Sequence, residues 1–390
     1  MKVTICVNNY LQFQGVNSVT DQFLLNAARF KSQGIHIDSI IDCQNVYHDV
    51  PDRSLSAKKS DDIKISLKKS KLYDTFLAKA LITYKNYWKI GKKAASLALE
   101  YSSKNQQDVM IFEDAIAAYY YLRSKNDSAN VIYMTHMFQD ELEQFLMNNA
   151  AIKGTFVEKK LRDVYRFVYE KSDEIVTICQ SASDSILNRF NKSSTIIYNS
   201  IEKFNVEERK ETNNRVNFVV ASSINHRKGS DLLCCVLEKL PQDYSSRSEF
   251  HIFGDGPFLR EFEERMSKRE NIHFYGSTQK PYLHYGTMDV LLLPSRLETL
   301  PMSIIEGMCA HLPIVASNVG ATKELVDDKT TGILFDPSEE SLMEAIKGSV
   351  DNRATLRQMG EEGYKKFCDH FESDIWVSRF VDLFKKMKGI

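Results

Sequence analysis

Short runs of apolar, mostly β-branched residues alternate along the chain with longer segments whose apolar positions recur at helical spacing. Such short continuous runs are typical of strands buried on both faces of a parallel sheet. Helices between them predict βαβ units in an open, doubly wound sheet. The strands predicted in the first half are KVTICV (2–7), IHIDSIID (35–42), VMIF (109–112), NVIYMT (130–135), EIVTIC (174–179) and TIIYN (195–199).

A second series of strands follows a polar stretch, residues 199–215, that lacks apolar periodicity and is typical of a linker. We therefore expect two Rossmann-like α/β domains, 1–205 and 206–372. Residues 373–390 are expected to form a C-terminal helix that packs back on the N-terminal domain through an apolar stripe. The strands predicted in the second half are VNFVVA (216–221), EFHIFG (249–254), NIHFYG (271–276), DVLLLPS (289–295), PIVASN (313–318) and GILFD (332–336).

The segment 58–93 is unusual because it holds eleven lysines and only three acidic residues. Between Leu72 and Trp88 its apolar side chains fall on one helical face, and most of the lysines fall on the other. Two interpretations remain open. One is a helix that lies on an anionic membrane surface, and the other is an ordinary core-facing helix with a solvated basic face.

Composition and charge exclude several classes of protein. A net charge of −1 and a pI near 6.8 provide no overall field that would attract nucleic acid. The seven cysteines contain no C-x-x-C pair, so neither a disulfide framework nor a zinc ribbon is expected, and a reducing cytoplasm suits them best. The first residues do not resemble a signal peptide, and no apolar stretch approaches the roughly 18 residues that span a bilayer. Any membrane contact is expected to be peripheral.

The candidate chemistry lies in four loops that each follow a strand of the second half. Ligands of open parallel sheets bind at the carboxyl ends of the strands, and the helix that follows each loop offers free N–H groups to an anion. The first loop provides Arg227 and Lys228, and Gly254 in the second allows close backbone approach. The loops are ASSINHRKGSD (221–231), FGDGPFLREF (253–262), PSRLETLPMSIIEGM (294–308) and SNVGATKELV (317–326).

The order of these motifs resembles that of the retaining glycosyltransferases of family four. R-K-G, G-D-G-P, N-x-x-F-x-G and D-V-x-x-x-P-S-x-x-E are followed by a second glutamate eight positions on, and then by LPIVASNVGATKELV and TGILF. The match is dense over residues 214–336 and loose in the first half. The resemblance implies the GT-B fold, in which two Rossmann domains face each other across a cleft and the C-terminal one holds a nucleotide-sugar.

Two glutamates carry the central part of this resemblance. It implies that Glu306 accepts hydrogen bonds from the ribose hydroxyls and that Glu298 lies beside the donor sugar. A carboxylate suits both tasks because it accepts charge-assisted hydrogen bonds from two hydroxyls. By the same resemblance, the backbone N–H groups of Thr299, Leu300 and Met302 meet the sugar and the diphosphate.

The sequence also departs from the family pattern. The family usually has an arginine five residues before the lysine of the first loop, and Ser223 stands at that place. Arg227, directly before Lys228, is the candidate that replaces the missing charge. Gly254 and Tyr275 belong to FGDGPF and IHFYGS, the loops that lie beside the base in the family. We expect a UDP- or GDP-sugar, although the base is not specified by these residues.

The N-terminal half is expected to bind the acceptor. Gly15 corresponds to the glycine-rich diphosphate loop of the family, with glutamine in place of its first glycine. His136, just after a strand, stands where the family has a histidine that faces the donor sugar. A lone histidine at a strand end is often structural, and the matching context favours the functional interpretation.

The resemblance implies transfer of a hexose-type sugar to a glycan or lipid-linked acceptor with retention, in surface polysaccharide, lipopolysaccharide or glycoprotein glycan assembly. The chain contains no D-x-D motif, so Arg227, Lys228 and helix N-termini, rather than a metal ion, are expected to meet the diphosphate. No further cofactor is expected. Two alternatives stay open: a GT-B epimerase or hydrolase, and a non-catalytic nucleotide-sugar-binding partner of another transferase.

Overall fold

The computed structural model describes residues 1–8, 14–50, 76–137, 141–206, 215–278 and 280–389, in two compact units. The first unit comprises Met1–Ile197 and Val377–Ile390, and the second comprises Tyr198–Trp376. The boundary thus falls eight residues before the expected position at 205. Residues 207–214 of the predicted linker lie outside the described residues.

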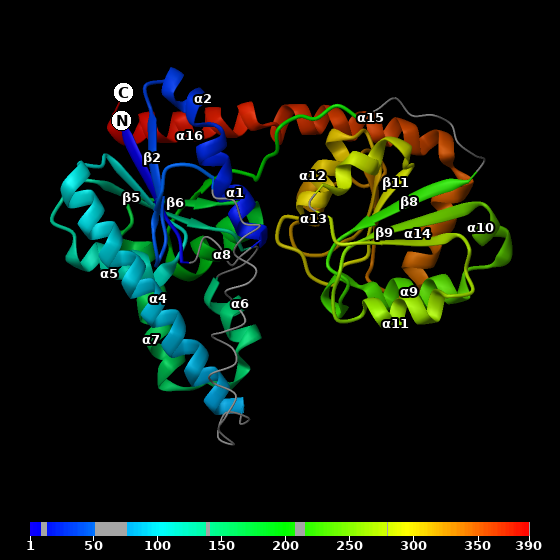
Figure 1. Ribbon diagram of the computed structural model, residues 1–390, viewed down its shortest axis with the longest axis horizontal. Helices are drawn as coiled ribbons and strands as arrows, with labels where there is room; N and C mark the ends of the chain where they lie inside the picture. Colours follow the sequence, from blue (N-terminus) through cyan, green and yellow to red (C-terminus); the bar gives the residue numbers. More distant parts are fainter. Residues whose placement is uncertain (9–13, 51–75, 138–140, 207–214, 279, 390) are drawn as a thin grey trace. The chain divides into compact units, whose positions relative to one another are not determined.

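The first unit is built on a seven-stranded sheet with the order β3-β2-β1-β4-β5-β6-β7 (Figure 1). All neighbouring strands are parallel except β2 and β3. The strand order reverses direction between β1 and β4, which marks the edge where ligands of such sheets bind. The strands are β1 (Lys2–Cys6), β2 (His36–Ile41), β3 (Val46–Tyr47), β4 (Val109–Phe112), β5 (Asn130–Thr135), β6 (Glu174–Thr177) and β7 (Thr195–Ile196).

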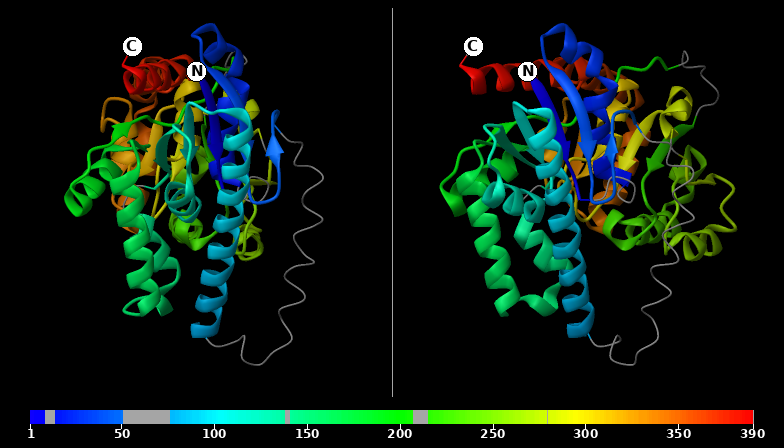
Figure 2. Two further views of the ribbon diagram at one scale, coloured as in Figure 1. Left: turned by 90° about the vertical axis from the view of Figure 1, so that its left-hand side faces the viewer. Right: turned by 60° about the vertical axis from the view of Figure 1, so that its left-hand side comes forward.

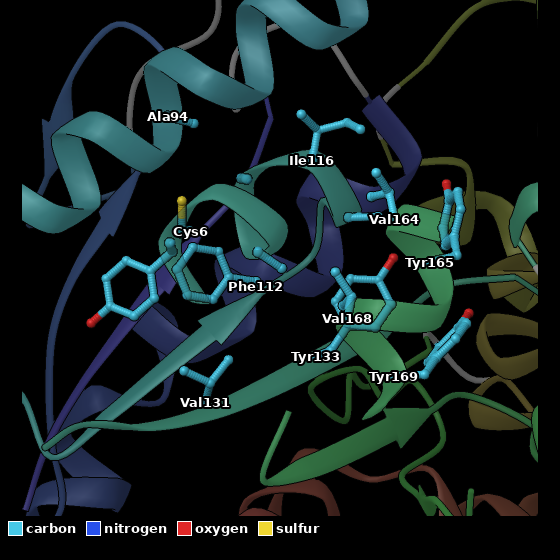
Figure 3. Packing of buried hydrophobic residues seen from close by; sticks show 14 of the residues in the cluster. Cys6, Ala94, Phe112, Ile116, Val131, Tyr133, Val164, Tyr165, Val168 and Tyr169 are labelled. Carbon is cyan, nitrogen blue, oxygen red and sulfur yellow. The ribbon is translucent and has the colours of Figure 1, made fainter. Parts of the chain in front are cut away.

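Helices pack on this sheet and on one another through buried apolar side chains. Figure 3 shows a buried cluster in which β4 and β5 pack against the helices around Ile116 and Tyr165. The last helix, α16, lies on the same unit, where Phe380 contacts Phe23 edge-on at 4.9 Å between ring centroids. The helices are α1 (Gln14–Leu25), α2 (Ala27–Ser32), α4 (Phe76–Asn105), α5 (Ala115–Ser124), α6 (Glu141–Asn148), η3 (Ala150–Ile152), α7 (Phe156–Lys171), α8 (Gln180–Phe190) and α16 (Ser373–Lys388).

The lysine-rich segment 58–93 is described only from Phe76 onward, and its side chains from Tyr84 onward. In this part Tyr84 and Trp88 are half-buried against the core, and Lys85 and Lys89 are exposed. This part of the helix follows the core-facing interpretation, and residues 58–75 lie outside the described residues. Within the described ranges, no helix combines the length and the apolar character needed to cross a membrane.

The second unit is built on a six-stranded parallel sheet with the order β10-β9-β8-β11-β12-β13. Its order reverses between β8 and β11. The strands are β8 (Val216–Ala221), β9 (Ser248–Phe253), β10 (Ile272–Gly276), β11 (Val290–Leu293), β12 (Ile314–Ser317) and β13 (Gly332–Phe335). The helices are η4 (His226–Lys228), α9 (Ser230–Lys239), α10 (Gln242–Ser246), α11 (Leu259–Met266), η5 (Pro281–Thr287), α12 (Met302–Cys309), α13 (Thr322–Leu325), α14 (Glu339–Asp351) and α15 (Arg353–His370).

Every predicted strand is present, which confirms the doubly wound α/β prediction, with ends that differ by a few residues. Parallel strands buried on both faces form continuous apolar runs, and this pattern is the strongest that a single sequence carries. The prediction missed β3, which is only two residues long.

Candidate nucleotide-sugar site

The loop between β8 and α9 lies against the strand end of β11, at the reversal of strand order in the second unit. Asn225 caps the short η4 helix, since its side-chain oxygen accepts a hydrogen bond from the Lys228 N–H at 3.0 Å. Gly229 has a φ of 69°, and a Cβ there would lie 1.8 Å from the Pro294 carbonyl oxygen. Only glycine therefore permits this contact between the two loops.

A second set of contacts joins the same two loops through Arg296. Its guanidinium donates two hydrogen bonds to the Asp231 carboxylate, at 2.6 and 2.9 Å, and a third to the His226 carbonyl at 2.8 Å. The Arg296 N–H also donates to the Arg227 carbonyl at 2.9 Å. Fork-shaped pairing of this kind fixes orientation as well as distance. The loops that carry Lys228 and Glu298 are thereby held as one rigid structure.

Lys228 and Glu298 form an ion pair at the centre of this structure. The Lys228 Nζ lies 2.6 Å from Glu298 Oε1, and the Ser295 hydroxyl donates to the same oxygen at 2.5 Å. The Glu298 side chain is 3% exposed and that of Lys228 is 15% exposed. Removing one partner of such a pair leaves a buried charge uncompensated, which is more costly than losing the pair as a whole.

The two remaining loops also approach through glycines. A Cβ on Gly320 would lie 1.9 Å from the Glu298 carbonyl oxygen, and one on Gly254 would lie 1.9 Å from the Ser222 carbonyl oxygen. Both glycines have positive φ, at 55° and 146°. The four loops that the sequence singled out are therefore packed together along the carboxyl edge of one sheet.

Glu306 lies inside α12, four residues after its first residue, Met302. The Tyr285 hydroxyl is the hydrogen-bond donor that the structure provides to its carboxylate, across 3.5 Å. Burial raises the pKa of Glu306 to about 7, and the hydrogen bond from Tyr285 offsets this only in part. Ionisation of the carboxyl group at this buried position therefore costs free energy. Groups perturbed in this way are common at ligand-binding sites.

The backbone groups predicted to meet a diphosphate lie at the start of α12. Thr299 and Leu300 precede the helix, Pro301 is its N-cap and Met302 is its first residue. The N–H groups of a first helical turn have no partner within the helix, and the aligned peptide dipoles favour an anion there. The positions of Thr299, Leu300 and Met302 at the start of α12 therefore agree with an anion-binding role.

The structure places Ser223 and Arg227 in the same loop as Lys228, and both are exposed. Arg227 Nη1 lies 3.4 Å from the Leu297 carbonyl oxygen, at the upper end of hydrogen-bond range. Asp231, the acidic residue nearest to Arg227 in sequence, is bound by Arg296 instead. The role of Arg227 as the replacement cation stays a prediction.

Tyr275 lies on β10 at the edge of the sheet and is 50% exposed. Its ring stacks on that of Phe253 with 4.5 Å between centroids, and its hydroxyl lies 2.9 Å from His251 Nδ1. Phe253 directly precedes Gly254, so the two residues predicted to lie beside the base are neighbours in the structure.

The two predicted residues of the first unit lie on different elements. Gly15 is the second residue of α1, and nothing more is described of it. His136 follows β5, and its Nε2 lies 3.3 Å from Glu113 Oε2, beyond the end of β4. Sequence reasoning missed Glu113, and it also missed Ser295 and Tyr285, which contact the predicted glutamates. Local pattern does not show which distant side chains meet.

Replacing Glu306 by glutamine is expected to stabilise the chain at alkaline pH. Below pH 4.5 the carboxyl group is protonated in both states, whereas between pH 4.5 and 7 only the native state keeps its proton, so stability falls as pH rises. The pKa shift corresponds to a loss of about 3 kcal/mol by pH 8. In urea unfolding, the Glu306→Gln chain should show most of this lost free energy of unfolding restored at pH 8, and little change at pH 4.5.

The exposed Glu263, in the same unit, provides the matched control. Glu263→Gln should leave the free energy of unfolding unchanged at both pH values, because its carboxylate is in water in both states. Equal effects of the two substitutions would contradict a buried, destabilising charge at Glu306.

Comparison with known proteins agrees with this geometry. Residues 200–366 match the family of glycosyl transferases group 1. The O-antigen biosynthesis glycosyltransferase WbnH of Escherichia coli is 30% identical over 240 residues, which are 60% of this chain and 65% of WbnH. The alignment thus spans slightly less than two thirds of that relative.

Two solved structures share the fold of the whole chain. Anabaena Alr3699/HepE in complex with UDP has a TM-score of 0.70 at 14% identity, covering 99% of this chain and 100% of the other. The lipopolysaccharide outer core galactosyltransferase WaaB, in its apo form, has a TM-score of 0.66 at 15% identity, with coverage of 99% and 100%. Together these likenesses confirm the resemblance drawn from the motifs: residues 200–366 match the group 1 glycosyl transferases, and the whole chain shares the GT-B fold.

Proposed function

We propose that this chain is a retaining glycosyltransferase that moves a hexose-type sugar from a UDP- or GDP-sugar to a hydroxyl of a glycan or lipid-linked acceptor. The buried Lys228–Glu298 pair, next to the start of α12, is the observation that carries the proposal. It places a cation, a carboxylate and free N–H groups at the carboxyl edge of the sheet, where phosphate and sugar would meet.

Each group of the site has a separate task in this proposal. Lys228 has three N–H donors and uses one on Glu298, so the others remain for phosphate oxygens. Glu298 accepts hydrogen bonds from the donor sugar. Glu306, four residues after Met302 and so roughly 6 Å along the helix axis, accepts them from the ribose. Tyr275 and Gly254 lie beside the base.

Transfer proceeds by attack of the acceptor hydroxyl on the face from which the nucleotide departs. Negative charge grows on the β-phosphate while the sugar ring becomes positive. Lys228, Arg227 and the N–H groups of Thr299, Leu300 and Met302 stabilise the growing negative charge through preorganised donors. The departing phosphate takes the acceptor proton. No divalent metal takes part in this scheme.

The biological setting proposed is the assembly of a surface polysaccharide, lipopolysaccharide or glycoprotein glycan. WbnH, the relative described above, acts in O-antigen biosynthesis, and another structure with the same fold has been solved with UDP-glucose. These likenesses support a nucleotide-sugar donor and a glycan product. They name no acceptor for this chain.

The purified chain should release nucleoside diphosphate from a UDP- or GDP-sugar only when a hydroxylated acceptor is present, and should do so equally in EDTA. Mass spectrometry of the product and NMR of its anomeric proton would show transfer and retention. Acceptor-independent release of free sugar would instead show a hydrolase, and activity that disappears in EDTA and returns with magnesium would contradict the metal-independent scheme.

The two glutamates should separate binding from turnover. Glu306→Gln should weaken binding of the nucleoside diphosphate by about 1.5–3 kcal/mol, because hydrogen bonds to a charged acceptor are lost. Glu298→Gln should leave this binding nearly intact and lower kcat, because in this proposal Glu298 accepts hydrogen bonds from the donor sugar and not from the nucleotide. Calorimetry with the diphosphate and kinetics with the sugar nucleotide distinguish the two. Equal losses of affinity in both variants would refute this division of roles.

A peripheral contact with an anionic membrane completes the proposal. α4 begins at one end of the first unit, where α6 ends and α7 begins (Figures 1 and 2). Met147 and Phe156 at this end are 62% and 74% exposed, and Lys153 and Lys159 beside them in sequence are exposed as well. Apolar side chains between lysines are typical of a surface that lies on anionic lipid.

Vesicles containing phosphatidylglycerol should sediment the chain at low salt, and vesicles of phosphatidylcholine alone should not. Phe156→Ser should weaken this binding several-fold, since it removes apolar area that would insert into the lipid. Glutamine at Lys68, Lys69 and Lys71 should weaken it by roughly a hundredfold, since about 1 kcal/mol is lost per lysine. Leu283→Ser changes a side chain of similar exposure in the other unit and is the control. If sedimentation does not change with salt or with any of these substitutions, the membrane contact is contradicted and the solvated-helix interpretation is favoured.

A further inference from the structure

Three residues that no motif connects form a buried chain of polar contacts in the first unit. The Thr20 hydroxyl, from α1, donates to the Glu113 carboxylate, with 2.9 and 3.1 Å to its two oxygens. Glu113 also pairs with His136, whose Nε2 lies 3.3 Å from Glu113 Oε2. The side chains of Glu113 and His136 are 2% and 8% exposed.

This chain of residues lies where the strand order of the first unit reverses. Glu113 directly follows β4, and its N–H donates to the carbonyl of Cys6, the last residue of β1. β1 and β4 are the strands that flank the reversal. Burying a charged carboxylate costs free energy unless it is paired. The fold does not need such a group at this edge of the sheet, where ligands bind, so its presence indicates a functional role.

We propose that Glu113 is the positioning residue of His136: its carboxylate binds the Nε2 proton, Thr20 holds the carboxylate, and Nδ1 is left as the ring atom that meets a sugar hydroxyl. The last part rests on the proposed function together with the family resemblance, which implies that His136 faces the donor sugar. Both ring nitrogens are buried, and neither makes a hydrogen bond to the described residues; Nε2 has the ion-pair contact with Glu113, whereas Nδ1 has no carboxylate beside it in the described part of the chain.

Charge explains why a carboxylate suits this position. Burial alone would lower the pKa of His136, but the Glu113 carboxylate, with a smaller contribution from Glu141 of α6, raises it above its ordinary value of 6.5. Of the elements around the ring, α1 contributes the neutral Thr20. The carboxylate therefore favours the imidazolium form of the ring, in which Nδ1–H can donate a hydrogen bond.

The pairing also matters for a transition state with a positive sugar ring. A lone imidazolium beside that ring would repel the developing charge in a site of low dielectric constant. Paired with Glu113, the imidazolium provides the same hydrogen-bond donor with no net charge. A carboxylate that orients a histidine and stabilises its cation is a known way to set both tautomer and charge.

Histidine NMR of the full-length chain without substrate tests the pairing directly. With the ring signal of His136 assigned by its loss in His136→Gln, Glu113→Gln should lower the pKa of His136, because the carboxylate that raises it is removed. Glu113→Gln preserves size, and thermal unfolding would confirm that it folds. Thr20→Val should move the pKa in the same direction by less, and Thr20→Ser should restore it.

Kinetics then test the functional consequence. Glu113→Gln should lower kcat by roughly tenfold or more with little change in KM for the nucleotide-sugar, and should shift the pH profile with the NMR value. A His136 titration that is unchanged in Glu113→Gln overturns the pairing, whether or not the chain transfers sugar. A shifted titration with kcat and pH profile like those of the unmodified chain overturns the positioning role while leaving sugar transfer itself in place.

Discussion

The contact between the two loops at the strand reversal of the second unit is the constraint on which its site depends. The Lys228–Glu298 pair can exist only because Gly229 lets one loop touch the Pro294 carbonyl and because Arg296 fixes the other loop to Asp231. A buried ion pair is a weak source of stability, since desolvation offsets much of its attraction. Its geometry is nevertheless well defined, and a preorganised cation beside a carboxylate is useful for binding a sugar phosphate.

The fold could be predicted because its strands are buried on both faces. VMIF and NVIYMT are strands over the same residues in sequence and structure, since a parallel strand between helices has no solvent face to interrupt its apolar run. β3 carries no such pattern: Val46 and Tyr47 pair with β2 at an edge and are only half-buried. The domain boundary was less predictable because polar composition marks a linker only to within several residues.

The site could be predicted only as far as its residues stand in motifs. The motif identified Glu298 and Glu306 by their spacing, but it did not identify the side chains that contact them. Tyr285 reaches Glu306 from a 3₁₀ segment 21 residues earlier, and Glu113 reaches His136 from another strand end. Side-chain pairing across loops depends on backbone geometry that periodicity does not encode.

The two units repeat one arrangement with different chemistry. In each, a hydroxyl donates to a buried carboxylate that also binds a cation: Ser295 to Glu298 beside Lys228, and Thr20 to Glu113 beside His136. A lysine is charged throughout the physiological range, so the first arrangement is a constant feature of the site. A histidine loses its proton within that range, so the second depends on pH unless the carboxylate holds the proton in place. The Glu113 carboxylate raises the pKa of His136 above its ordinary value, so the fold extends the pH range over which this histidine keeps its proton.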